Sequence, residues 1–263
     1  SAFVLEEISG NDPKDSTSNT EEVPNYSKYL NDDIKGVKIG VPKEYFVDEM
    51  DSDVASTVRS SIKILEELGA DISEVSLPHT SHALAVYYII APAEASSNLS
   101  RYDGVKFGYS HSESTDIWDA LEKTRQHGFG PEVKRRILLG TYALSSGYYD
   151  AYYLKAQKVR SLIRQDFVNV FKDVDILIAP STPTVAFPLG EKTSDPVQMY
   201  LNDIFTIPAN IAGIPAISIP AGLIKNMPIG VQLMGSHHSE QLLLKTAYAY
   251  EAAANHGFLK PSI

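Results

Sequence analysis

The hydrophobic pattern of residues 36–78 consists of two short apolar runs that flank an amphipathic one. "GVKIGVP" (36–42) and "DISEVSLP" (71–78) have the length of strands bounded by turn formers. Between them, residues 51–70 place apolar side chains at helical spacing and stop at Gly69. The expected buried face consists of Val54, Val58, Ile62, Leu65 and Leu68. A strand–helix–strand unit of this kind predicts two parallel neighbouring strands.

Residues 80–173 show mostly helical spacing of their apolar positions. Residues 81–100 are apolar nearly all round, which predicts a buried helix. Residues 114–129 begin with an acidic turn, as helices prefer, and residues 130–147 carry a proline near their start and end at Gly147. Residues 148–174 are expected to form one long amphipathic helix.

The last third of the chain returns to strand patterns. Residues 175–183 are an apolar run stopped by prolines, and residues 216–235 indicate two strands joined by a loop through Asn226 and Met227. Residues 239–257 indicate a final helix. The whole pattern predicts an α/β fold, with a mostly parallel or mixed sheet covered by helices.

The start of the chain looks different. Residues 1–10 have the pattern of the tail of an amphipathic helix, with Gly10 as its expected C-cap, and polar turn formers follow. We therefore expect residues 1–35 to form a helix tail and a surface connection, and residues 36–263 to belong to one domain.

Composition narrows the classes of function. Apolar residues make up 43% and charged residues 21%, as in a globular protein with a core. The formal net charge of −10 disfavours extensive direct contact with nucleic acid. The chain has no cysteine, which excludes disulfides and thiolate chemistry and suits a cytoplasmic location. No apolar run is long enough to predict a membrane span, and no signal peptide is expected.

The familiar catalytic motifs are missing from the chain. It contains no G-x-S-x-G elbow, Walker A loop or G-x-G-x-x-G fingerprint, and its seven histidines are scattered without a set of metal ligands. Ser145 and Ser146 precede a helix-ending glycine, and no base can be named that would activate them. From its residues alone, the chain shows no complete catalytic machinery.

Two consecutive arginines differ in their expected environments. On a helix over residues 130–147, the buried face consists of Val133, Ile137, Gly140 and Leu144. Arg136 falls roughly 60–70° from the centre of that face, whereas Arg135 falls nearly opposite. A guanidinium at the edge of a buried face needs an anionic partner. That partner is either a carboxylate of the protein, in an ordinary salt bridge, or an anionic ligand.

Asp203 raises the same question with the opposite charge. It lies in an expected short helix at residues 196–208, with apolar residues on every side, which predicts a buried carboxylate. It could cap the turn before Pro208. Alternatively, Arg136 and Asp203 could hold the carboxylate and the ammonium group of a free amino acid. The sequence does not show that the two side chains meet.

Several segments resemble the amidase signature family. The stretch "DIFTIPANIAGIPAISIPAG" (203–222) matches the family pattern D-x-F-T-x-P-A-N-x-A-G-x-P-A-x-S-x-P-x-G, and "MPIGVQLMG" follows as in the family. The segments at 94–109, 128–160 and 187–206 narrow the resemblance to the glutaminase subunits of tRNA-dependent amidotransferases. The resemblance covers almost the whole chain.

The resemblance implies which part of such a protein this is. The family uses a lysine, a serine in a cis peptide and a nucleophilic serine in a Gly/Ser-rich segment, and these would lie upstream of this chain. The chain would then be the C-terminal part of one amidase signature domain and inactive by itself. The family's glutamine-binding tyrosine falls on Tyr87, with Tyr88 as the neighbouring alternative. Its arginine falls on Arg136 and its aspartate on Asp203.

The resemblance also implies partners. Glutamine would be the substrate, and two further subunits would complete a heterotrimer that converts Glu-tRNA(Gln), Asp-tRNA(Asn) or both. ATP and Mg²⁺ would be used by the holoenzyme without binding to this chain, and the misacylated tRNA would be held mainly by a partner subunit. Two alternatives remain open: part of a stand-alone amidase acting on other amides, and a non-enzymatic α/β binding or scaffold domain.

Overall fold

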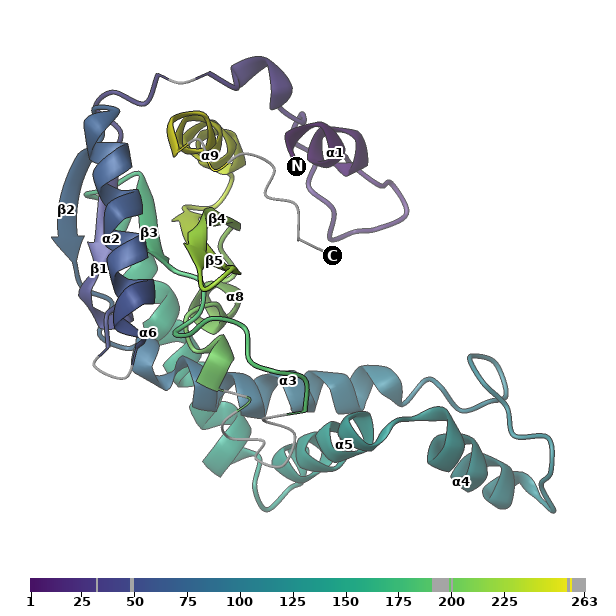
Figure 1. Ribbon diagram of the computed structural model, residues 1–263. Helices are drawn as coiled ribbons and strands as arrows, with labels where there is room; N and C mark the ends of the chain where they lie inside the picture. The colour runs from purple at the N-terminus through teal and green to yellow at the C-terminus, as the bar shows by residue number, and fades with distance from the viewer. Residues whose placement is uncertain (32, 48–49, 191–198, 200, 255, 257–263) are drawn as a thin grey trace. The chain divides into compact units, whose positions relative to one another are not determined.

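A mixed sheet with the strand order β2-β1-β3-β5-β4 organises the first of two compact units in the computed structural model (Figure 1). The structure describes residues 1–31, 33–47, 50–190, 199, 201–254 and 256. The first unit joins Ser1–Ser81 to Ile163–Ile263, and the second is His82–Leu162. The strands are β1 (Lys38–Pro42), β2 (Asp71–Val75), β3 (Ile176–Pro180), β4 (Ala216–Ile224) and β5 (Met227–Gly235).

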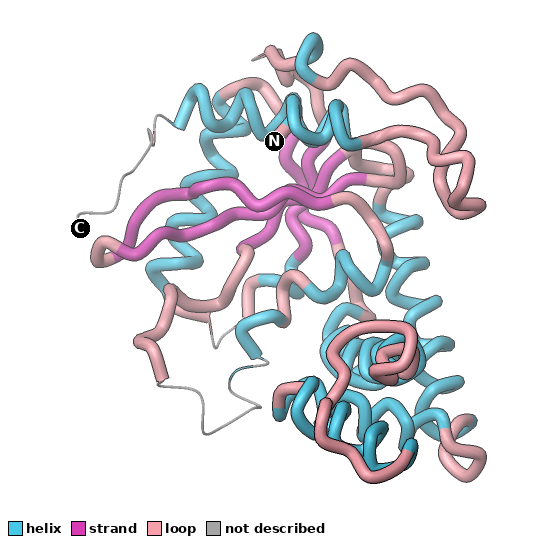
Figure 2. Tube along the Cα trace, turned by 90° about the vertical axis from the view of Figure 1, so that its right-hand side faces the viewer, coloured by secondary structure: helices cyan, strands magenta, loops and turns pink. Residues whose placement is uncertain are grey.

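The pairing of the strands confirms the predicted fold class. β1 is parallel to both β2 and β3, as the strand–helix–strand pattern predicted, while β5 is antiparallel to β3 and β4. β4 and β5 form the long hairpin at the left of Figure 2. Its turn is made by Lys225 (φ 50°) and Asn226 (φ 64°), a left-handed pair that suits the twist of a hairpin. The predicted loop was one residue late, because Met227 already belongs to β5.

Helices α2 (Ser52–Glu67) and α9 (Glu240–Ala254) contact each other and the strands β4 and β5. α2 begins where the Asp51 carboxylate accepts a hydrogen bond of 2.8 Å from the Asp53 N–H, and it ends before the left-handed Gly69. Of its predicted apolar face, Val54, Val58 and Leu65 are fully buried, and Ile62 and Leu68 are half-buried. All five residues of β3 are buried, as its apolar run predicted. Part of the core of this unit therefore lies between the sheet and these helices.

The second unit is helical, as predicted, and contains α3 (Ala83–Leu99), α4 (Ile117–Gly128), α5 (Pro131–Leu144) and the π-helical turn η4 (Asp150–Leu154). The long helix expected from residue 148 thus begins with η4 and continues as α6 (Lys155–Val170), which crosses the boundary between the units. The prediction that α3 is buried all round was wrong. Its buried residues are Ala83, Val86, Pro92 and Ala93, and the rest are partly or fully exposed.

Short elements complete the described chain. They are α1 (Ala2–Ile8), η1 (Ser27–Tyr29), η2 (Lys43–Tyr45), η3 (Thr80–His82), η5 (Leu201–Asp203) and α8 (Ile207–Ala212). The expected cap at Gly10 was wrong, because α1 ends at Ile8 and Ser9 takes the C-cap position in an extended conformation. The first half of the helix expected at 196–208 lies largely outside the described residues; from Leu201 onward the chain forms η5 and α8 instead.

Candidate functional site

Tyr87 and Arg136 meet inside the second unit. The Arg136 Nη1 atom donates a hydrogen bond of 3.3 Å to the Tyr87 hydroxyl, which joins α5 to α3. The side chain of Arg136 is 33% exposed and that of Arg135 is 51% exposed, in agreement with the helical geometry that placed only Arg136 at the edge of the buried face. Two residues that are 49 positions apart in the sequence are thus brought together by the packing of two helices.

Glu132 is the anionic partner of both arginines. Its Oε1 accepts a hydrogen bond of 3.0 Å from Arg136 Nε, and its Oε2 accepts one of 2.7 Å from Arg135 Nη1. The hydrogen bond that Arg136 donates to Glu132 raises the pKa of the Arg136 guanidinium, and burial opposes this shift. Sequence analysis missed Glu132, although its spacing of three and four residues from the arginines is the spacing at which helical side chains meet. The salt-bridge interpretation of Arg136 is therefore realised in this structure.

The two candidate tyrosines contact each other edge to face. The ring centroids of Tyr87 and Tyr88 are 5.0 Å apart, with an interplanar angle of 86°. The hydroxyl that receives the Arg136 hydrogen bond belongs to Tyr87. This contact favours Tyr87 over its neighbour as the tyrosine that would face a ligand of Arg136.

Asp203 ends η5 in the first unit and is exposed. The predicted burial of its carboxylate was therefore wrong: the apolar pattern around it buries Phe205, Ile207 and Pro208 but turns Asp203 outward. Its carbonyl oxygen accepts hydrogen bonds from the Thr206 N–H at 3.1 Å and from the Thr206 hydroxyl at 3.2 Å. Asp203 and the Tyr87–Arg136 pair belong to different compact units.

The segment after Asp203 is tied to the sheet by Gln232. This buried side chain of β5 donates hydrogen bonds to the carbonyl oxygens of Pro180 at 2.9 Å and Phe205 at 2.7 Å. The Phe205 ring also stacks on Tyr45, with centroids 5.5 Å apart. Gln232 is a residue that sequence analysis missed, and it fixes the backbone two residues beyond Asp203.

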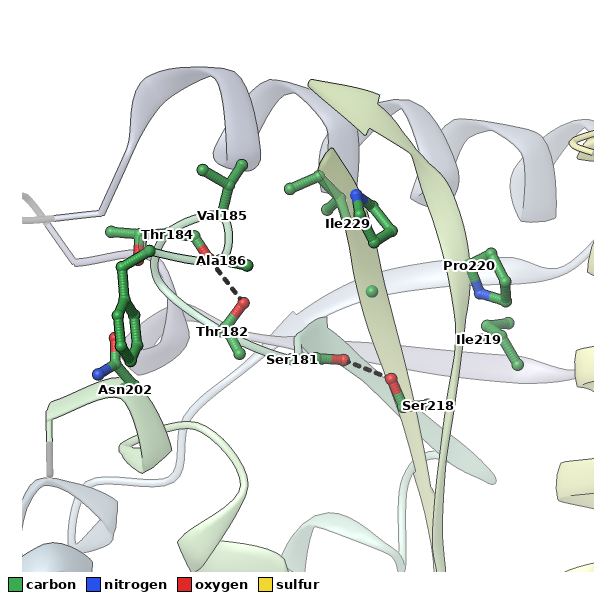
Figure 3. Close-up of a pocket in the computed structure, with 13 residues that line it drawn as sticks. Ser181, Thr182, Thr184, Val185, Ala186, Asn202, Ser218, Ile219, Pro220 and Ile229 are labelled. Carbon is green, nitrogen blue, oxygen red and sulfur yellow. Dashed lines mark hydrogen bonds between the residues drawn. The ribbon is translucent and has the colours of Figure 1, made fainter. Parts of the chain in front are cut away.

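A cavity of about 470 Å³ opens at the end of β3 in the first unit (Figure 3). Ser181 and Ser218 point toward each other in it, with their Oγ atoms 2.9 Å apart. Gly230 permits this pair, because a Cβ there would lie 2.9 Å from Ser218 Oγ and 3.0 Å from Ser181 Oγ. The described lining residues include no ionisable side chain, so the cavity offers no base that could activate either serine.

Metal sites and membrane spans are both missing from the described residues. No cluster of three or more histidine, aspartate or glutamate side chains there could hold a metal ion. No helix in the same part of the chain combines the length and the apolar character that a membrane span requires.

Comparison with known proteins decides the family. The model of the Amidase family matches residues 1–244. The chain belongs to the amidase family. It is 59% identical over 250 residues to the A-subunit of the glutamyl-tRNA(Gln) amidotransferase of Carboxydothermus hydrogenoformans, which covers 95% of this chain and 52% of the relative. It is 58% identical to the corresponding A-subunit of Halothermothrix orenii, over 100% of this chain and 55% of that relative.

Solved structures agree with this assignment. The crystal structure of the glutamyl-tRNA(Gln) amidotransferase A-subunit from Thermotoga maritima is 39% identical and matches with a TM-score of 0.74, covering 95% of this chain and 49% of that one. A bacterial aryl acylamidase matches with a TM-score of 0.70 at 20% identity, which supports the fold alone. The chain thus spans about half the length of the relatives it matches. The assignment of Tyr87, Arg136 and Asp203 to ligand binding stays a prediction.

Proposed function

We propose that this chain is the glutamine-binding, C-terminal part of the glutaminase subunit of a tRNA-dependent amidotransferase. The observation that carries the proposal is the Tyr87–Arg136 pair, found in a chain 58–59% identical to proteins named as the A-subunit of such an enzyme. A guanidinium held beside a tyrosine hydroxyl offers a planar fork for a carboxylate. Glutamine presents such a group on its α-carbon.

In this proposal each site residue has one task. Arg136 binds the α-carboxylate of glutamine, the Tyr87 hydroxyl helps to hold the guanidinium by accepting from Nη1, and Asp203 binds the α-ammonium group. The lysine and the two serines of the family's catalytic centre belong to the part of the protein that precedes these residues. Their nucleophilic serine takes the acyl group of glutamine, ammonia leaves, and water releases glutamate.

The proposal extends to the assembly. The released ammonia passes to a partner subunit of a cytoplasmic heterotrimer, which uses ATP and Mg²⁺ to activate the misacylated tRNA and then amidates it. The tRNA is Glu-tRNA(Gln), Asp-tRNA(Asn) or both. The net charge of −10 supports an arrangement in which the partner subunit makes most of the tRNA contacts.

Arg136→Lys in the full-length subunit, assembled with its partners, tests the proposal. A lysine keeps the charge but loses the fork, so we expect kcat/KM for glutamine to fall at least tenfold, about 1.4 kcal/mol. Amidation with ammonium chloride in place of glutamine should persist, because ammonia bypasses the glutamine site. Arg135→Lys is the matched control, since Arg135 is the more exposed partner of Glu132.

The outcomes separate the candidate functions. If Arg136→Lys leaves kcat/KM for glutamine within about twofold of the control, less than ~0.5 kcal/mol, Arg136 does not bind the substrate. If the full-length protein hydrolyses other amides without partner subunits and ignores glutamine, it is a stand-alone amidase.

A further inference from the structure

Glu132 accepts a hydrogen bond from Nε of Arg136, the arginine proposed to bind glutamine, and none from its two Nη atoms. We propose that Glu132 is a positioning residue for glutamine: it holds the Nε side of the Arg136 guanidinium so that the Nη end faces the α-carboxylate of the substrate. The inference rests on the proposed function and adds one residue to its site.

The hydrogen bonds define which face of the guanidinium is occupied. Arg136 donates from Nε to Glu132 Oε1 at 3.0 Å and from Nη1 to the Tyr87 hydroxyl at 3.3 Å. Its Nη2 atom makes no hydrogen bond to the described residues. Each Nη atom carries two N–H groups, so Nη1 can serve Tyr87 and still donate to a ligand. The two Nη atoms therefore keep N–H groups that can donate to a carboxylate.

The local charge favours a Glu132 that orients Arg136 over one that competes with the glutamine carboxylate for Arg136. Glu132 brings one negative charge to two arginines, which leaves the three side chains with one net positive charge. Arg135 donates to the second carboxylate oxygen at 2.7 Å, and that oxygen accepts no hydrogen bond from Arg136 in the structure. Attraction for an anionic ligand is retained.

Glu132 occupies a position in α5 that suits a carboxylate. It lies in the first turn of the helix, directly after Pro131, where the helix dipole favours a carboxylate. The side chain of Glu132 is 46% exposed, and ion pairs this exposed add little to stability. An effect of Glu132 on glutamine binding can therefore be measured without unfolding the protein.

Glu132→Ala in the full-length subunit within the assembled enzyme gives the decisive comparison. Loss of one orienting hydrogen bond should raise the KM for glutamine about 3- to 10-fold and change kcat much less. Glu132→Gln keeps an acceptor oxygen for Arg136 Nε, so its KM should stay within about twofold of the wild type. Glu122→Ala, at an exposed glutamate of α4, is the control for loss of a surface charge. The rate with ammonium chloride monitors assembly.

Each outcome has one meaning. A raised KM in Glu132→Ala with rescue by Glu132→Gln supports the positioning role. An unchanged KM overturns it, and a lowered KM in both variants overturns it in favour of a carboxylate that competes with the substrate. Arg136→Lys is measured in the same series: if it leaves kcat/KM for glutamine within about twofold of Arg135→Lys, the proposed function fails, whereas a fall in kcat/KM there with no effect of Glu132→Ala refutes this inference alone.

Discussion

Gly140 of α5 lies against the carbonyl group of Pro92 in α3, so closely that a Cβ at this position would overlap the carbonyl oxygen. A side chain here would have to push apart the two helices that carry Arg136 and Tyr87. Backbone atoms line the contact, and they cannot move aside as the end of a flexible side chain can. The glycine is required for this close approach of α3 and α5.

We expect Gly140→Ala to destabilise the second unit by about 1–3 kcal/mol, the usual cost of overpacking, even though alanine is the better helix former. The midpoint of urea unfolding measures the loss. Thr141→Ala, at an exposed position of the same helix, is the matched control and should shift the midpoint far less. A Gly140→Ala variant as stable as the control would contradict the close approach.

Ser61 and Tyr250 join α2 to α9 through a buried hydrogen bond of 2.8 Å. Removing either hydroxyl breaks this bond, and the two substitutions should lower the free energy of unfolding by different amounts. In Tyr250→Phe, Ser61 still donates to the Thr57 carbonyl oxygen at 3.2 Å, so we expect a loss of about 0.5–1.5 kcal/mol. In Ser61→Ala the Tyr250 hydroxyl loses its near partner and, among the described residues, keeps only His256 Nε2 at 3.4 Å.

The expected loss for Ser61→Ala is therefore larger, about 1–3 kcal/mol, because a buried hydroxyl is left poorly paired. Urea unfolding of the two variants side by side measures the difference. Equal losses, or a larger loss in Tyr250→Phe, would show that the hydroxyl of Tyr250 is not the group that needs a partner.

The chain alone should release no ammonia from glutamine. The only serine pair in its described cavity, Ser181 and Ser218, has no base beside it, and a serine without a base is a weak nucleophile. A coupled glutamate dehydrogenase assay with purified chain measures this. Ammonia release that scales with chain concentration and is lost in Ser181→Ala would refute the proposal that the catalytic residues lie in another part of the protein.

Much of this fold could be predicted from the sequence, because apolar spacing and helix-ending residues act over a few neighbouring positions. The β1–α2–β2 unit follows from apolar spacing and from the helix stop at Gly69, and the exposure difference between Arg135 and Arg136 follows from helical geometry. Glu132 could have been found by the same rule, since it lies three and four residues before the arginines.

The remainder depends on contacts between distant residues. The approach of Gly140 to Pro92 and the pairing of Ser181 with Ser218 join positions that are far apart in the sequence, and no local pattern encodes them. The errors on α3 and Asp203 have a related cause. The apolar positions of α3 show that its surface favours burial, but not which other segment packs on it. The apolar residues around Asp203 likewise do not show in which direction a polar side chain in a short turn will point.

The role of Asp203 can be tested separately from that of Arg136. Asp203→Asn keeps the size of the side chain but removes the negative charge that would face the α-ammonium group of glutamine. A hydrogen bond to a charged group contributes about 1.5–3 kcal/mol, and the exposure of Asp203 argues for the lower end of that range. In the assembled full-length enzyme, KM for glutamine should therefore rise about tenfold.

The comparison needs a control that removes the same charge from the same unit, and Asp173→Asn, at an exposed aspartate, provides it. The rate of tRNA amidation with ammonium chloride should be equal in both variants, because neither change touches the step after ammonia release. Higher ionic strength should weaken glutamine binding by the wild type more than by Asp203→Asn, since salt screens a charge pair that the variant lacks. If Asp203→Asn and Asp173→Asn show the same KM at every salt concentration, Asp203 does not bind the ammonium group, and Arg136 holds glutamine without it.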